Sequence, residues 1–192
     1  MKTRLDIQPG AILIAAMVYF FGDFEILAAL LGSSLLHEWG HAAVLRLCGA
    51  KVRCIRADMT GLRMDYRGLR LTRFREFLSA AAGPVAGALG AWVASFWGNW
   101  FRCDFLLLFA GTSLVLTLFN LIPAKPLDGW RMLHTLSEPI AEGVSFVTAV
   151  AVLVAGLWLL MNDYGPGLAV MGIILLLEGT EKTNSRAAPI WA

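Results

Sequence analysis

Residues 35 to 45 read LLHEWGHAAVL, and this stretch places two histidines and a glutamate inside an otherwise apolar run. Ionisable groups are costly within a bilayer, so their presence in an apolar helix indicates a functional site. The pattern H-E-x-x-H places His37 and His41 one helical turn apart on one face, where both imidazoles can bind one metal ion. Glu38 is suited to act as general base on a water molecule at that metal. The alternative is a pair of helical histidines with an incidental acid.

The composition is that of a polytopic membrane protein rather than a soluble enzyme or a nucleic-acid-binding protein. The 192 residues are 58% hydrophobic and 16% charged, whereas soluble domains have about 45–50% apolar and about 25% charged residues. The mean hydropathy is +0.67. Cys48, Cys54 and Cys103 lack paired spacing, which predicts neither a disulfide framework nor a cysteine metal site. The basic N-terminus runs directly into apolar sequence without a cleavage pattern, so we expect the first apolar run to be retained.

Six apolar segments are candidate transmembrane helices, for which about 20 residues are typical. The first and the last are short, and a Gly-Asp pair separates the first from the second. The segments cover residues 7–21, 26–47, 76–98, 105–122, 144–161 and 167–177. We therefore expect an all-α polytopic membrane protein with about six spans, forming a single domain over residues 1–192.

Residues 48–75 differ from the spans because they are rich in arginine and lysine. Within GLRMDYRG, Leu62, Met64 and Tyr66 alternate with charged residues, which is the pattern of a strand with one apolar face. We expect two short strands over 52–66, forming a small membrane-associated β-hairpin between the second and third spans. The alternative is a basic loop with accidental alternation.

The distribution of charge predicts the orientation of the spans. If the N-terminus is cytoplasmic, Arg102 is the one residue among the 16 lysines and arginines that falls on the outer side. Acidic residues occupy the outer turns, namely Asp23, Glu25, Asp104 and Asp163. This asymmetry satisfies the positive-inside rule, so we expect both termini in the cytoplasm and HEWGH in the cytoplasmic half of the bilayer.

A catalytic zinc ion needs a third protein ligand and an open position. The candidates are Asp128 in KPLDGW, Glu178 in LLLEGT and His134 in RMLHTL. We prefer Asp128, because the prolines and glycine around it create non-helical backbone of the kind that lines sites at membrane depth. The alternative for Asp128 is a helix N-cap.

Three motifs together resemble the site-2 proteases, which are intramembrane zinc metalloproteases. HEWGH fits HExGH, AAGP at 81–84 fits a small-residue-Gly-Pro signature, and NLIPAKPLDG fits N-x-x-P-x-x-P-L-D-G. Their order and membrane placement match over roughly residues 30–130. The chain most resembles the stage IV sporulation protein FB group, which implies six spans, an active site toward the cytoplasm of a bacterial cell membrane and no PDZ domain.

The resemblance implies a role for each matching residue. His37, His41 and Asp128 would bind Zn²⁺, Glu38 would activate the water, and Asn120 would help to position substrate. The alternative for Asn120 is an interhelical hydrogen bond. One departure is a Gly-Trp pair after the aspartate, where family members often have Gly-Gly. The second is that we expect no C-terminal CBS domain, which many sporulation-type members carry.

The resemblance also implies the partners of the protein. They are the lipid bilayer and a membrane-tethered regulatory precursor such as a pro-sigma factor, with an extended segment of the substrate docking on a strand edge. Inhibitory membrane partners are compatible with this assignment, and we expect no nucleic acid.

Two alternatives remain open at this point. One is a membrane HExxH protease of another family with Glu178 as third ligand. The other is a non-catalytic metal-binding membrane protein that uses the same histidines, although such a protein has no need of Glu38.

Overall fold

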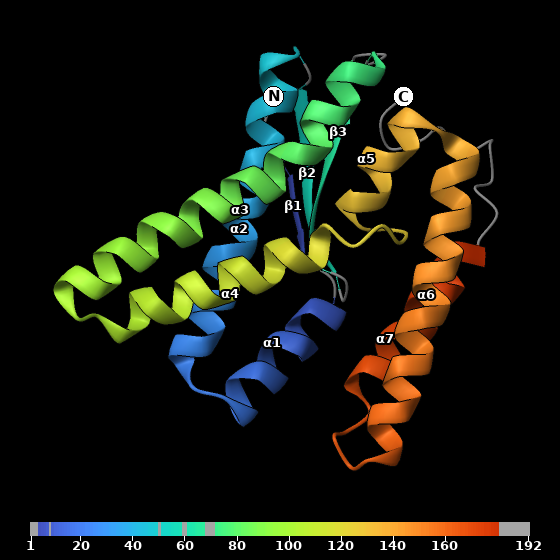
Figure 1. Ribbon diagram of the computed structural model, residues 1–192. Helices are drawn as coiled ribbons and strands as arrows, with labels where there is room; N and C mark the ends of the chain where they lie inside the picture. Colours follow the sequence, from blue (N-terminus) through green and yellow to red (C-terminus); the bar gives the residue numbers. More distant parts are fainter. Residues whose placement is uncertain (1–3, 8, 50, 59–60, 68–71, 181–192) are drawn as a thin grey trace. The chain divides into compact units, whose positions relative to one another are not determined.

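The computed structural model describes residues 4–7, 9–49, 51–58, 61–67 and 72–180, which Figure 1 draws as ribbons. The chain divides into two compact units, the first ending at Phe119 and the second beginning at Asn120. The single metalloprotease domain over residues 1–192 stays a prediction.

The described part of the first unit contains three strands and four helices, the last of which ends at the boundary between the units. These elements are β1 (Arg4–Ile7), α1 (Pro9–Phe21), α2 (Phe24–Leu47), β2 (Lys51–Asp58), β3 (Gly61–Arg67), α3 (Arg73–Phe101) and α4 (Asp104–Asn120).

The three strands form one sheet in the order β1-β2-β3. β2 and β3 are antiparallel, with Lys51 opposite Arg67 and Asp58 opposite Gly61. The strands expected over 52–66 are therefore present, whereas the turn between them at 59–60 lies outside the described residues. The hairpin's place on a membrane surface stays a prediction.

The sheet contains a strand that the sequence did not predict. β1 pairs parallel to β2, with Leu5 opposite Ile55. Residues 4–7 are too few to show a convincing period-2 pattern, and their partner lies about fifty positions further along the chain. The first predicted span, at 7–21, accordingly begins two residues later, at Pro9.

Local signals account for where several helices begin and end. Pro9 is the first residue of α1, where its missing N–H is no loss. The Oγ1 of Thr72 accepts a hydrogen bond of 3.4 Å from the N–H of Arg75 and caps α3. α2 ends at Leu47, and Gly49 then adopts a φ of 90°, a conformation that glycine adopts at low cost after a helix.

Small residues bring α2, α3 and α4 close together. A Cβ on Gly40 of α2 would lie 2.7 Å from the Cβ of Ala86 in α3, so the two backbones approach as closely as glycine allows. Hydroxyl groups join α2 to α4: the Ser113 hydroxyl donates to the Oγ of Ser33 at 2.9 Å, and Ser33 donates to the carbonyl of Ala29 at 2.7 Å.

The second unit contains α5 (Asp128–Leu136), α6 (Glu138–Met161) and α7 (Gly167–Thr180). α6 and α7 run side by side (Figure 1), and glycines line the contact. The core of this unit is built around Ala124, Ala149 and Leu175.

Lys125 fastens the segment before α5 to α6. Its backbone N–H donates to the Oγ of Ser145 at 2.9 Å, and its Nζ lies 2.6 Å from a carboxylate oxygen of Glu142. The same Nζ lies 4.8 Å from the centroid of the Trp130 ring, within the range of a cation–π interaction. The prolines of this segment are thereby held against a helix rather than left in a free loop.

Among the described residues, small side chains fill the interior and large ones face outward. The largest fully buried side chains are Leu175, Ser33 and Ser113, whereas Trp92 is 69% exposed and Phe146 is 61% exposed. A soluble protein buries its large apolar side chains, so this inverted distribution is the one expected of helices packed in lipid.

The six apolar segments correspond to α1, α2, α3, α4, α6 and α7. Among the described residues, α3 and α6 are long and apolar enough to cross a membrane, and α4 and α7 are shorter apolar helices. The six-span arrangement stays a prediction. α6 begins six residues earlier than the predicted 144–161, and α5 was expected only under the alternative of Asp128 as a helix N-cap.

We predict opposite effects for two glycine-to-alanine substitutions in the second unit. A Cβ on Gly172 would lie 2.5 Å from the Cα of Leu153, whereas a Cβ on Gly143 would meet nothing within 4 Å. Gly172→Ala should lower the free energy of unfolding by about 1–3 kcal/mol through overpacking, and Gly143→Ala should raise it by up to about 1 kcal/mol through helix propensity. Thermal unfolding in one detergent measures both, and equal midpoints would contradict the packing of α6 against α7.

Candidate metal centre

Two histidines of α2 place their ring nitrogens together inside the first unit. His37 and His41 are 4% and 7% exposed. Their ring centroids are 4.9 Å apart with an interplanar angle of 80°, and their Nε2 atoms are 3.2 Å apart. The i, i+4 spacing of HEWGH therefore brings both rings to one point, as predicted.

A backbone carbonyl of α3 fixes the protonation of one ring. The Nδ1 of His41 lies 2.7 Å from the carbonyl oxygen of Ser79, which can only accept. Nδ1 must therefore carry the proton in this contact, and Nε2 keeps its lone pair. This is the arrangement in which a metal-binding histidine is held by a second hydrogen bond.

Gly83 leaves the space in which the two rings meet. A Cβ on Gly83 would overlap the Nε2 of His41 and lie 2.8 Å from the Nε2 of His37. Any larger residue would occupy the point toward which both nitrogens are directed. Gly83, which belongs to the AAGP motif at 81–84, thus leaves room for the two rings at the site.

The spacing of the two nitrogens fits a zinc ion. Zn–N bonds are about 2.0–2.1 Å long, so two ligands at the tetrahedral angle are about 3.3 Å apart. The observed separation of 3.2 Å is close to this value. Two neutral imidazoles and a carboxylate form a donor set that zinc commonly takes.

Asp128 is the first residue of α5 and is buried, with 4% of its surface exposed. The N-cap of this helix is Leu127, so the alternative reading of Asp128 as the cap is wrong. The Nη1 of Arg131 donates to the Oδ1 of Asp128 at 3.2 Å, one turn along the same helix. This ion pair orients the carboxylate, which retains lone pairs for a further partner.

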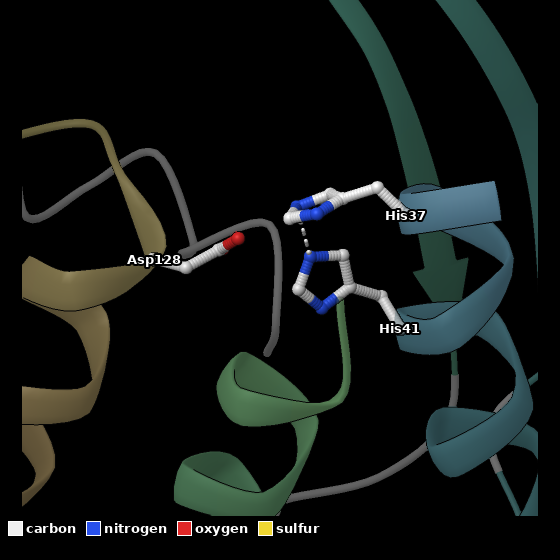
Figure 2. A group of neighbouring side chains, drawn as sticks. All are labelled: His37, His41 and Asp128. Carbon is white, nitrogen blue, oxygen red and sulfur yellow. Dashed lines mark hydrogen bonds between the residues drawn. The ribbon is translucent and has the colours of Figure 1, made fainter. Parts of the chain in front are cut away.

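Figure 2 shows the three side chains that could hold a metal ion. Each of His37, His41 and Asp128 offers one ligand atom, and these atoms all lie within 4.8 Å of one another. Among the described residues these three form the group that could hold a metal ion, and neither Glu178 nor His134 belongs to it. Glu178 lies half-buried in α7, and His134 lies beside the Trp130 ring with centroids 4.8 Å apart.

The other two predicted site residues lie at the expected places along the chain. Glu38 is half-buried on α2, next to His37. Asn120 is the last residue of α4 and is also half-buried. Their roles in catalysis and substrate binding stay predictions.

Sequence reasoning missed the groups that hold the ligands. The carbonyl of Ser79 carries no side-chain signal, because any residue could supply it. Arg131 could have been found, since an acid followed three positions later by arginine on a helix is a common ion pair.

No protein-family model matches the chain. It is 32% identical over 127 residues to "Putative zinc metalloprotease Rip3" from two strains of Mycobacterium tuberculosis. The alignment covers 62% of this chain and 32% of the relative, so the chain spans about a third of the length of the curated relatives it matches.

The structure is also similar to the solved structure of the site-2 protease from Methanocaldococcus jannaschii. The TM-score is 0.69 and the sequence identity is 24%. The similarity covers 91% of this chain and 88% of that one. The chain therefore has the fold of a site-2 protease.

Proposed function

We propose that the chain is an intramembrane zinc metalloprotease of the site-2 protease family. Its substrate would be a membrane-tethered protein, cleaved in or near its transmembrane segment. The observation that carries the proposal is the group of His37, His41 and Asp128 on a site-2 protease fold. The similarity to a mycobacterial protein named as a zinc metalloprotease supports it.

In this proposal, His37, His41 and Asp128 hold the zinc ion. When bound, zinc polarises the carbonyl to be cleaved and makes a water molecule acidic enough to attack near neutral pH. The hydrogen bond from His41 to Ser79 keeps one ligand nitrogen in its binding form. The ion pair with Arg131 does the corresponding work of orientation for Asp128.

Glu38 moves the proton. Its carboxylate accepts a proton from the attacking water and later delivers it to the departing amine as the C–N bond breaks. Asn120 carries an amide that can donate to the substrate backbone, which supports a positioning role at the end of α4.

The substrate must be presented in an extended form, because a helix keeps its carbonyls within its own hydrogen-bond ladder. β3 is an edge strand of the sheet, and a substrate segment could pair with it by β-augmentation. We propose a single-span regulatory precursor as the substrate, cleaved on the cytoplasmic side. Neither relative is described as a sporulation protein, so the proposal does not extend to a pathway.

Removal of single ligands tests the metal set. Purified wild-type chain should bind about one zinc ion, and His37→Ala, His41→Ala and Asp128→Ala should each lose most of it, because a structural or catalytic zinc needs at least three protein ligands. Glu178→Ala should bind zinc like the wild type. Zinc per chain is measured by atomic absorption after gel filtration. Loss in Glu178→Ala together with retention in Asp128→Ala would support the other HExxH family instead.

A methyl group placed at the meeting point of the rings should displace a ligand. Gly83→Ala should weaken zinc binding by at least about tenfold, in the range seen when the supports of metal ligands are altered. Gly111→Ala is the matched control, because a Cβ there meets nothing within 4 Å. Competition with a zinc chelator measures both affinities, and equal affinities would contradict the geometry of the pair.

Glu38→Gln should separate metal binding from chemistry. The amide cannot accept the proton, so cleavage of a co-expressed single-span substrate should fall about 10²–10⁴-fold. Zinc content should stay at the wild-type level, because Glu38 is not a ligand in this proposal. Immunoblotting of the cleaved fragment reports activity. Equal cleavage by both proteins would refute the protease and leave a metal-binding membrane protein.

A further inference from the structure

Thr117 carries a buried hydroxyl group that the proposed mechanism does not use. The residue lies on α4 and is 4% exposed, and its Oγ1 is buried without a hydrogen-bond partner. Helical threonines usually bond to a carbonyl of the preceding turn. Thr112 and Thr135 do so, with distances of 3.0 and 2.7 Å. Thr117 is therefore an exception that needs an explanation.

The hydroxyl of Thr117 is directed at a glycine beside a proposed metal ligand. A Cβ on Gly87 of α3 would overlap the Oγ1 of Thr117, and the Nδ1 of His37 lies 3.8 Å from the same point. The hydroxyl and the ring nitrogen thus border one gap, which exists because residue 87 has no side chain. All three residues belong to the first unit.

We propose that Thr117 is a positioning residue for His37. Its Oγ1 accepts a hydrogen bond from Nδ1–H of His37 across the gap at Gly87 when the metal is bound. The contact holds the imidazole in the tautomer whose Nε2 has a free lone pair. Hydrogen bonds at functional sites commonly tighten when the site is occupied.

The arrangement would match the one already seen at the other ring. His41 has its Nδ1 held by the Ser79 carbonyl of α3. With Thr117 of α4 serving His37, each ligand would be oriented by a different helix. The inference rests on the proposed zinc site, which His37 must help to form.

The test compares two substitutions at Thr117 in the full chain in detergent. Thr117→Val keeps the shape but removes the hydroxyl, and it should weaken zinc binding by about 10–100-fold, as the loss of such supports does. Thr117→Ser keeps the hydroxyl and should restore most of the affinity. Thr112→Val is the matched control on the same helix, because its hydroxyl bonds elsewhere, and it should leave zinc affinity unchanged.

A second readout follows the proton itself. The chain has three histidines, so His134→Ala leaves only the His37 and His41 resonances in the ¹⁵N-histidine spectrum of the zinc-loaded protein. The wild type should show Nδ1–H on His37, with a resonance that shifts in Thr117→Val and returns in Thr117→Ser. Zinc binding by the wild type that is unaltered in Thr117→Val would overturn the inference alone. Absence of zinc binding in the wild type would overturn the proposed function.

Discussion

The site depends on how closely α2, α3 and α4 approach one another. Gly40, Gly83 and Gly87 remove the side chains that would otherwise keep these helices apart. Only at this distance can the Ser79 carbonyl of α3 reach a ring nitrogen on α2. An ionisable residue among apolar helices is costly unless another group forms a hydrogen bond with it. For His41 that group is the backbone carbonyl of Ser79 in the neighbouring helix. The close packing of these helices and the meeting of the two histidine rings thus have the same structural cause.

Sequence predicted the parts of this arrangement that are encoded locally. The spacing of HEWGH was enough to bring His37 and His41 together, and apolar runs were enough to locate six of the seven described helices. Asp128 was preferred over Glu178 because prolines break the helix around it, and Asp128 is one of the three described residues that could hold a metal ion. In each case the signal lies within a few residues of the feature.

The rest depends on contacts between distant segments. β1 is a strand because it pairs with β2, which lies about fifty positions further along the chain. Its four residues are too few to show the alternating pattern from which a strand is predicted. α5 has only nine residues and follows a proline-rich segment, so the sequence favoured the interrupted end of a longer helix over a separate helix. The Gly-Trp pair that departs from the site-2 protease pattern is explained by two contacts: the Trp130 ring lies 4.8 Å from the Lys125 ammonium and 4.8 Å from the His134 ring, and glycine would make neither.

The inverted distribution of side-chain size has a consequence for how this protein can change over time. Among the described residues, most buried positions are alanine, serine or glycine, which have almost no smaller replacement and little room for a larger one. Its bulky residues face outward, where one apolar side chain serves nearly as well as another. Sequence drift should therefore accumulate at tryptophan, phenylalanine and leucine, while the smallest residues stay fixed. A ranking of positions by side-chain volume would thus order their mutational tolerance in the opposite sense to that of a soluble enzyme.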